Sequence, residues 1–149
     1  MPAERFVTGS SVTSHLPVRP NPRMVLIGRV LSGLFVVFML GASIAPKFMG
    51  LDAARDSLTA LGWPAEHLLL IGGLELAFVA LYLYPRTAVL GAVLMTGLIG
   101  GAMASHIRAG SPLLSHTLFG IYLSLFMWGG LWLRSPALRA LFPFASNKE

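Results

Sequence analysis

The chain has 149 residues, of which 55% are hydrophobic and only 11% are charged, and its mean hydropathy is +0.73. Soluble domains carry about 25% charged residues, so this composition argues against a soluble domain and indicates a membrane protein. The chain has no cysteine, which excludes disulfides, thiolate metal sites and iron–sulfur clusters. The net charge of +5 does not indicate nucleic-acid binding, because the basic residues lie at the ends of apolar segments and form no patch.

The chain divides into a polar beginning, an apolar middle and a polar end. Residues 1–23 are rich in Pro, Ser and Arg and contain no apolar core of a signal peptide. We therefore expect a flexible cytoplasmic tail over 1–23, a four-helix transmembrane domain over 24–143 and a second tail over 144–149.

Four apolar segments have the length of about 20 residues that an α-helix needs to cross a bilayer. The predicted spans are 24–45, 65–84, 88–105 and 113–133. None alternates polar and apolar residues, which argues against a β-barrel. The short connections after the second and third spans make neighbouring helices antiparallel. The predicted fold class is therefore all-α, an integral membrane four-helix bundle with up-down-up-down topology.

The connections between the spans carry turn and capping signals. Pro64 and Pro112 stand where the second and fourth helices begin, and Gly110 can end the third in a left-handed conformation. In the longest connection, 47–63, apolar residues recur at helical spacing between charged ones. This pattern predicts a short interfacial helix between the first two spans, although a mixed loop packed on the bundle would also fit.

The Lys and Arg residues favour one orientation in the membrane. With the N-terminus inside, the inner side holds Arg5, Arg19, Arg23, Arg29, Arg86, Arg134, Arg139 and Lys148, and the outer side holds Lys47, Arg55 and Arg108. This excess of inner positive charge predicts that both termini are cytoplasmic, and we expect a bacterial inner membrane.

Glu75 lies near the centre of the second predicted span. A charge at that depth costs at least about 2.5 kcal/mol, so Glu75 should be protonated, paired or facing a wet cavity. It would either anchor a ligand or carry a proton, or it would hold the bundle together through one interhelical hydrogen bond. Gly72, Val79 and Tyr82 share its helical face. We therefore include Gly72 and Tyr82 among the candidate ligand-binding residues.

Lys47 follows Pro46 at the end of the first predicted span. Two interpretations remain open. Its ammonium group would reach over the mouth of the bundle to a carboxylate or another anionic group, or it would extend to the lipid phosphates.

Two histidines and an arginine gather around the connection between the third and fourth spans. His106 and His116 should lie at the same depth. Three roles remain open for them: ligands of a metal or haem, parts of a polar ligand site, or structural hydrogen-bonding groups. Two histidines alone do not define a metal site, so we expect none. If the helix continues, Arg108 lies about 200° around it from His106, and the two side chains cannot both face the bundle.

The order of these features resembles the DoxX-like family of small four-helix membrane proteins. The resemblance covers about residues 24–143 and rests on Pro46-Lys47, "LGWP", the membrane glutamate, "YPRTAVLGA" and a Gly-rich helix that ends in His-x-Arg. The family pattern maps onto Lys47, Glu75, His106 and Arg108, and His116 is a further polar candidate. The family name comes from a membrane subunit of an archaeal thiosulfate:quinone oxidoreductase, so the resemblance implies a quinone-linked redox role.

We accordingly expect a polar pocket between the second, third and fourth helices, with Glu75 as its floor and His106, His116, Arg108 and Lys47 as its rim. Glu75 or a histidine would exchange protons with a quinol while Arg108 polarises a carbonyl oxygen. A quinone is the cofactor that the resemblance implies, and haem is not expected. The protein would be a subunit of a quinone-dependent oxidoreductase. We expect contact with the bilayer and with other membrane or redox proteins, or assembly into a homo-oligomer. The alternatives are a non-catalytic scaffold or assembly subunit and a small proton-coupled transporter.

Overall fold

The computed structural model describes residues 21–141 and consists of helices joined by short turns. The predicted tail 144–149 and nearly all of the predicted tail 1–23 lie outside the described residues. The helices of the described part are α1 (Pro22–Phe38), the π-helix η1 (Met39–Ile44), α2 (Ala45–Phe48), α3 (Asp52–Ala60), the 3₁₀-helix η2 (Ala65–His67), α4 (Leu68–Leu83), α5 (Ala88–Arg108), the π-helix η3 (Leu113–Thr117), α6 (Phe119–Arg134) and α7 (Pro136–Leu141).

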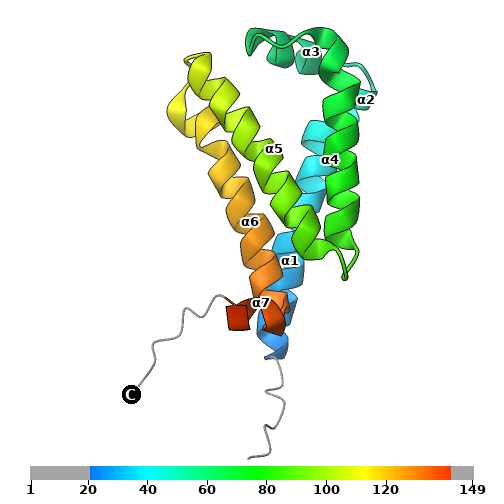
Figure 1. Ribbon diagram of the computed structural model, residues 1–149, viewed down its shortest axis with the longest axis vertical. Coiled ribbons are helices and arrows are strands. Elements are labelled where there is room, and N and C mark those ends of the chain that lie inside the picture. Colours follow the sequence, from blue (N-terminus) through cyan, green and yellow to red (C-terminus); the bar gives the residue numbers. More distant parts are fainter. Residues whose placement is uncertain (1–20, 142–149) are drawn as a thin grey trace, which may run out of the picture.

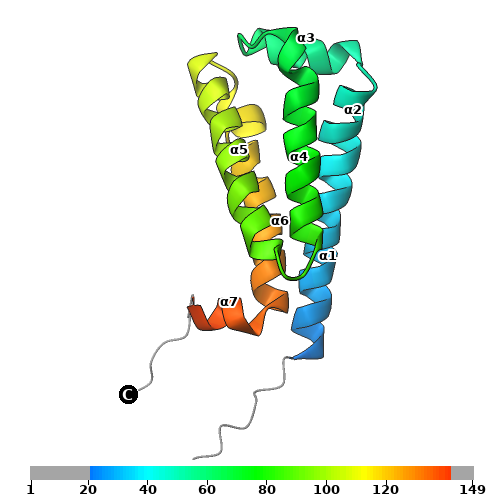
Figure 2. The ribbon, with the colours of Figure 1, turned by 45° about the vertical axis from the view of Figure 1, so that its right-hand side comes forward.

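Four continuous helical segments are long and apolar enough to cross a membrane. They are Pro22–Phe48, Ala65–Leu83, Ala88–Arg108 and Leu113–Arg134. They run alternately up and down, as Figures 1 and 2 show. The prediction of an all-α membrane bundle is confirmed, and α3 is the predicted short helix between the first two spans.

The helices differ from the predicted spans mainly at their ends. α1 begins at Pro22, where the Asn21 side chain accepts a hydrogen bond from the Arg23 amide (3.0 Å) and caps the helix. The first span continues past η1 through α2 to Phe48, and the third continues to Arg108. The apolar pattern marks the part of a helix that contacts lipid or core. A helix whose last turn is polar is therefore longer than the pattern predicts.

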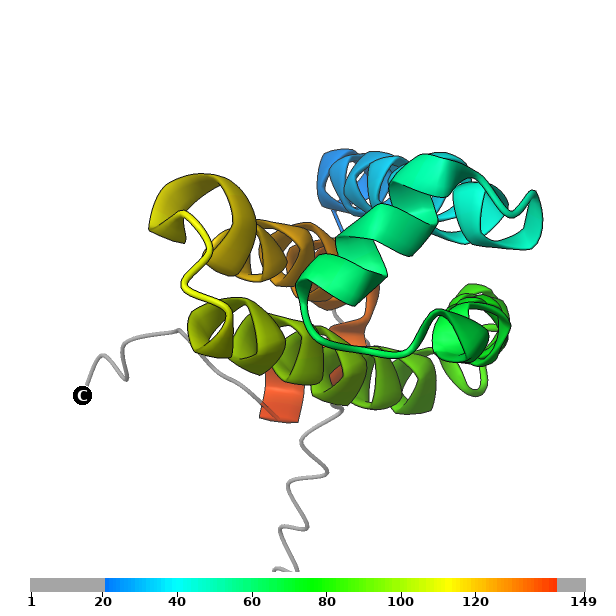
Figure 3. The ribbon, with the colours of Figure 1, turned by 90° about the horizontal axis from the view of Figure 1, so that it is seen from above.

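The two ends of the bundle have different coverings. α3 lies across the end where the first span meets the second, and Figure 3 shows it crossing over the bundle when the molecule is seen from above. α7 turns sideways at the opposite end, beside the start of α1 (Figure 2). We call these the α3 end and the α7 end. Gly50 and Gly62, with φ of 64° and 77°, allow the sharp turns on either side of α3.

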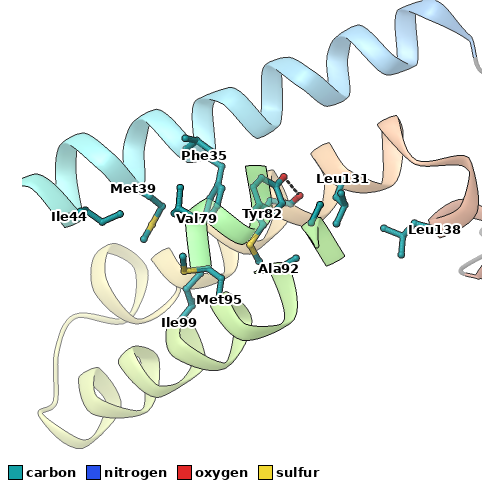
Figure 4. Packing of buried hydrophobic residues seen from close by; sticks show 13 residues of the cluster. Phe35, Met39, Ile44, Val79, Tyr82, Ala92, Met95, Ile99, Leu131 and Leu138 are labelled. Atoms are coloured by element: carbon teal, nitrogen blue, oxygen red, sulfur yellow. Dashed lines mark hydrogen bonds between the residues drawn. The ribbon is translucent and has the colours of Figure 1, made fainter. Parts of the chain in front are cut away.

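The core is a narrow seam along the middle of the bundle. Phe35, Tyr82, Met95 and Met127 are almost completely buried in it, and Figure 4 shows several of its side chains. Large apolar side chains elsewhere on the spans, such as Leu70, are exposed. In a bilayer these exposed faces contact lipid chains, so the packed seam needs only one stripe of each helix.

Glycines allow the helices of each packed pair to approach closely. A Cβ on Gly28 of α1 would stand 2.7 Å from the carbonyl oxygen of Gly130 in α6, and a Cβ on Gly91 of α5 would stand 2.4 Å from the backbone nitrogen of Tyr82 in α4. Small residues at such crossings are typical of membrane helices, because close packing replaces the hydrophobic effect there.

Candidate functional site

An ion pair joins the first and second spans inside the bundle. The Nζ atom of Lys47 lies 3.1 Å from Oε1 and 3.0 Å from Oε2 of Glu75. The two side chains are only 16% and 10% exposed. The sequence left two interpretations of Lys47 open. In the structure its ammonium group reaches a carboxylate, that of Glu75.

Ser43 completes this site, which we call the Lys47–Ser43–Glu75 cluster. Its hydroxyl group accepts a hydrogen bond from Lys47 Nζ (2.7 Å) and lies 3.0 and 3.1 Å from the two carboxylate oxygens of Glu75, to which it donates. The carbonyl oxygen of Ser43 also accepts from Lys47 Nζ at 3.1 Å. Both charged groups therefore have several partners, which is the condition under which a buried ion pair is tolerated.

The π-helix η1 places Ser43 and Lys47 on the side of the first span that faces α4. Pro46 has no amide proton, and its ring disfavours a regular α-helical turn before it. In η1 the amide of Ala45 bonds to the carbonyl of Leu40, five residues back. Single π-helical turns inside α-helices occur frequently at functional sites.

Gly72 brings α4 close to α2 beside the cluster. A Cβ on Gly72 would stand 3.2 Å from Cβ of Lys47 and 3.4 Å from the Phe48 ring. The structure thus places this candidate ligand-binding residue directly against Lys47, where it makes room for the lysine stem.

A groove of about 460 Å³ opens next to the cluster at the α3 end. Of the three cluster residues, Lys47 lines it. The remaining lining mixes apolar and charged side chains from α2, α3, η2 and α4, including Phe48, Met49, Arg55, Glu66, Leu68 and Leu69. Its volume lies within the range of about 300–1,000 Å³ that small-molecule sites occupy.

The two histidines form a separate pair at the α3 end. The ring centroids of His106 and His116 are 5.5 Å apart. Nδ1 of His106 is hydrogen-bonded to Ser111 (3.0 Å), and Nδ1 of His116 is hydrogen-bonded to Ser115 (2.8 Å). The sequence analysis placed the two histidines at the same depth, and the structure adds that their rings are neighbours.

Arg108 points toward the connection that follows α3. Its guanidinium group donates a hydrogen bond to the carbonyl oxygen of Leu61. Nearby, Nε1 of Trp63 donates to the hydroxyl group of Ser105 (3.1 Å). These two contacts tie the segment after α3 to the last turns of α5.

The structure does not join these groups into one hydrogen-bonded site. Among the described residues, no hydrogen bond or ion pair connects Glu75 to His106, His116 or Arg108. The partners of Glu75 come from the first span, whereas the sequence-based pocket was placed between the second, third and fourth helices. Within residues 21–141, no group of three or more His, Asp or Glu side chains is arranged to hold a metal ion.

Tyr82 is a core residue in this structure. Its side chain is fully buried, and its hydroxyl group donates to the carbonyl oxygen of Met127 (2.8 Å). That hydroxyl has one proton, so the Ser32 hydroxyl, 2.8 Å away, donates to it. Tyr82 thus connects α1, α4 and α6, at a distance of about 10 Å along α4 from Glu75.

Ser43 is the site residue that the sequence analysis missed. It precedes Lys47 by four positions, so the two residues share one helical face. The sequence did contain a signal for Ser43: its hydroxyl group lies on the same helical face as Lys47, the only charge at that end of the first span.

Comparison with known proteins agrees with the sequence resemblance. The model of one family, described as the DoxX-like family, matches residues 30–130. The matched region contains all three residues of the Lys47–Ser43–Glu75 cluster and both histidines of the pair. No curated protein and no solved structure matched the chain. The match covers most of the chain, with the second and third spans complete and the larger part of the first and fourth, and the chain therefore belongs to the DoxX-like family.

Proposed function

We propose that this protein is a quinone-binding membrane subunit of a redox system, and that the quinone head group binds in the groove beside Lys47. The observation that carries the proposal is the Lys47–Ser43–Glu75 cluster, a largely buried ion pair that is hydrogen-bonded through Ser43 and borders a groove of mixed polarity. Charged residues inside membrane spans are costly, so their presence favours a functional role.

The residues around the groove fit a quinone head group. Such a ring has two flat apolar faces and two carbonyl oxygens. Phe48, Met49 and Leu69 supply apolar surface, and the Arg55 guanidinium group can donate hydrogen bonds to a carbonyl oxygen. The Lys47 ammonium group lines the groove and would donate to the other carbonyl oxygen in place of one of its contacts within the cluster. The lipid-exposed faces of the spans provide a path along which an isoprenoid tail can lie.

The chain's own residues would bind the ring and handle protons. Lys47 would orient one carbonyl oxygen, and Glu75 would accept or supply a proton through the Ser43 hydroxyl group, which is hydrogen-bonded to both charged groups. When bound, the quinone supplies the two-electron chemistry. The chain has no cysteine, so the electrons would pass to or from a cofactor of a partner redox protein.

Binding of a short-chain quinone to the full-length protein in lipid nanodiscs tests the proposal. We expect wild type to retain the quinone and Lys47→Met to bind it at least about tenfold more weakly, since one charge-assisted hydrogen bond is lost. Asp52→Asn is the matched control, because Asp52 is an exposed carboxylate at the same end that does not line the groove. Wild-type protein that fails to bind any quinone would contradict the proposal.

The double variant Lys47→Met/Glu75→Met separates this proposal from a scaffold role. Replacing both partners of a buried ion pair with apolar side chains is often neutral for stability. A scaffold would therefore keep its fold and its assembly in the double variant. The quinone-binding protein would keep its fold and lose the ligand.

A further inference from the structure

The α7 end of the bundle concentrates arginines without any counter-charge in the described part of the chain. Arg23, Arg29, Arg86, Arg134 and Arg139 all lie at this end. The carboxylates of residues 21–141 lie elsewhere: Asp52 and Asp56 in α3, Glu66 in η2 and Glu75 paired with Lys47. The α3 end, by contrast, balances Lys47, Arg55 and Arg108 against these acidic groups.

Arg134 is the most unusual member of this group. It ends α6, and its Nε and Nη2 atoms are buried and have no hydrogen-bond partner among the described residues. Its guanidinium group lies over the ring of Tyr82, 5.1 Å from the centroid. A ring face attracts a cation but does not satisfy two N–H donors, so this guanidinium group retains unused capacity for an anion.

Arg139 contacts the end of α6 and the start of α1. Its Nη1 atom donates to the carbonyl oxygen of Leu133 (3.0 Å) and lies 3.9 Å from the Met24 sulfur. The backbone of Arg134 packs on Gly28, one turn further along α1. Arg139 and the last residue of α6, Arg134, therefore both lie at the start of α1, at the end of the bundle where no carboxylate of the described residues offsets their charge.

We propose that Arg134 and Arg139 form a binding site for the phosphate group of an anionic phospholipid. Guanidinium groups bind phosphate oxygens through paired N–H donors. Basic pockets beside the ends of membrane helices are the usual place for such head groups.

The surrounding surface favours a lipid over a free phosphate ion. Leu26 and Ile27 on α1 are 63% and 52% exposed, and Leu141 of α7 is 74% exposed. These side chains provide apolar surface for acyl chains next to the two arginines. α7 lies across the bundle axis (Figure 2), as an interfacial helix does at the head-group level.

The test uses full-length protein in nanodiscs of phosphatidylcholine with an increasing fraction of phosphatidylglycerol, followed by native mass spectrometry of the released protein. We expect wild type to retain phosphatidylglycerol preferentially. Retention should fall about fivefold for Arg134→Gln or Arg139→Gln alone and about 30-fold for both. Arg86→Gln loses the same charge from the exposed turn between α4 and α5 and should leave retention nearly unchanged.

A second measurement on wild type needs no variant. Its thermal unfolding temperature should rise with the phosphatidylglycerol fraction, and 10 mM inorganic phosphate in phosphatidylcholine nanodiscs should not reproduce the rise. An equal rise with inorganic phosphate would overturn the lipid assignment. So would equal retention of both lipids by wild type, or equal losses in Arg86→Gln and Arg139→Gln.

Discussion

Removal of the Glu75 charge should destabilise the bundle, because it leaves the Lys47 ammonium group without its counter-ion. In Glu75→Gln the amide oxygen still accepts one hydrogen bond, so the loss is mainly electrostatic. Breaking a buried ion pair from one side costs about 3–5 kcal/mol. The Lys47 side chain keeps 16% of its surface exposed and lines the groove, so its ammonium group can turn toward solvent or head groups. We therefore expect a loss of about 2–3 kcal/mol in the free energy of unfolding.

Equilibrium unfolding in mixed micelles by titration with sodium dodecyl sulfate measures this loss. The comparison needs wild type, Glu75→Gln, Lys47→Met and the double variant Lys47→Met/Glu75→Met. The double variant should be more stable than either single variant and within about 1 kcal/mol of wild type. A loss below about 0.5 kcal/mol in Glu75→Gln would refute the reasoning. So would a loss of unfolding free energy in the double variant that equals the sum of the losses in Glu75→Gln and Lys47→Met.

Three further predictions concern the packing that positions the cluster. Tyr82→Phe should lower the free energy of unfolding by about 1–2 kcal/mol, because the Ser32 hydroxyl loses its buried acceptor; an unchanged unfolding midpoint would count against this. Gly91→Ala should destabilise the protein by more than about 2 kcal/mol through collision with the backbone of α4, whereas Gly97→Ala, with open space around it, should be neutral or stabilising in the same titration. Trp63→Phe should speed hydrogen exchange in α3 by releasing its contact with α5, and unchanged exchange would show that this hydrogen bond does not hold α3 in place.

The fold could be predicted because the bilayer constrains it so strongly. A helix needs about 20 apolar residues to cross, and every backbone polar group inside must be paired within its own helix. The four apolar segments therefore had one stable interpretation, and Pro64, Pro112 and Gly110 marked where helices begin or end. Gly110 indeed has a positive φ of 68° after α5. The π-helix η1 was not predicted. The sequence shows that Pro46 interrupts the regular helical hydrogen bonding, but it does not show whether the helix kinks, ends or forms a π-helical turn there.

The arrangement of the candidate site depended on facts that one helix at a time cannot supply. Periodicity placed Tyr82 and Glu75 on one face of α4, and they do share that buried face. That face is long enough to contact different neighbours at different depths, so Glu75 reaches Ser43 and Lys47 while Tyr82 reaches Ser32 and Met127. A shared face therefore did not imply a shared site.

The sequence by itself determined the number of spans, their approximate limits, the short helix between the first two and the presence of a charge that needs a partner, since each of these follows from the cost of polar groups in hydrocarbon. Only the tertiary structure decided that the partner of Glu75 is Lys47 and that Arg108 contacts the segment after α3. It alone left Arg134 without a hydrogen-bond partner for two of its nitrogen atoms within the described chain. These outcomes depend on which helices are neighbours and on how each is rotated, and side chains far apart in the sequence set both.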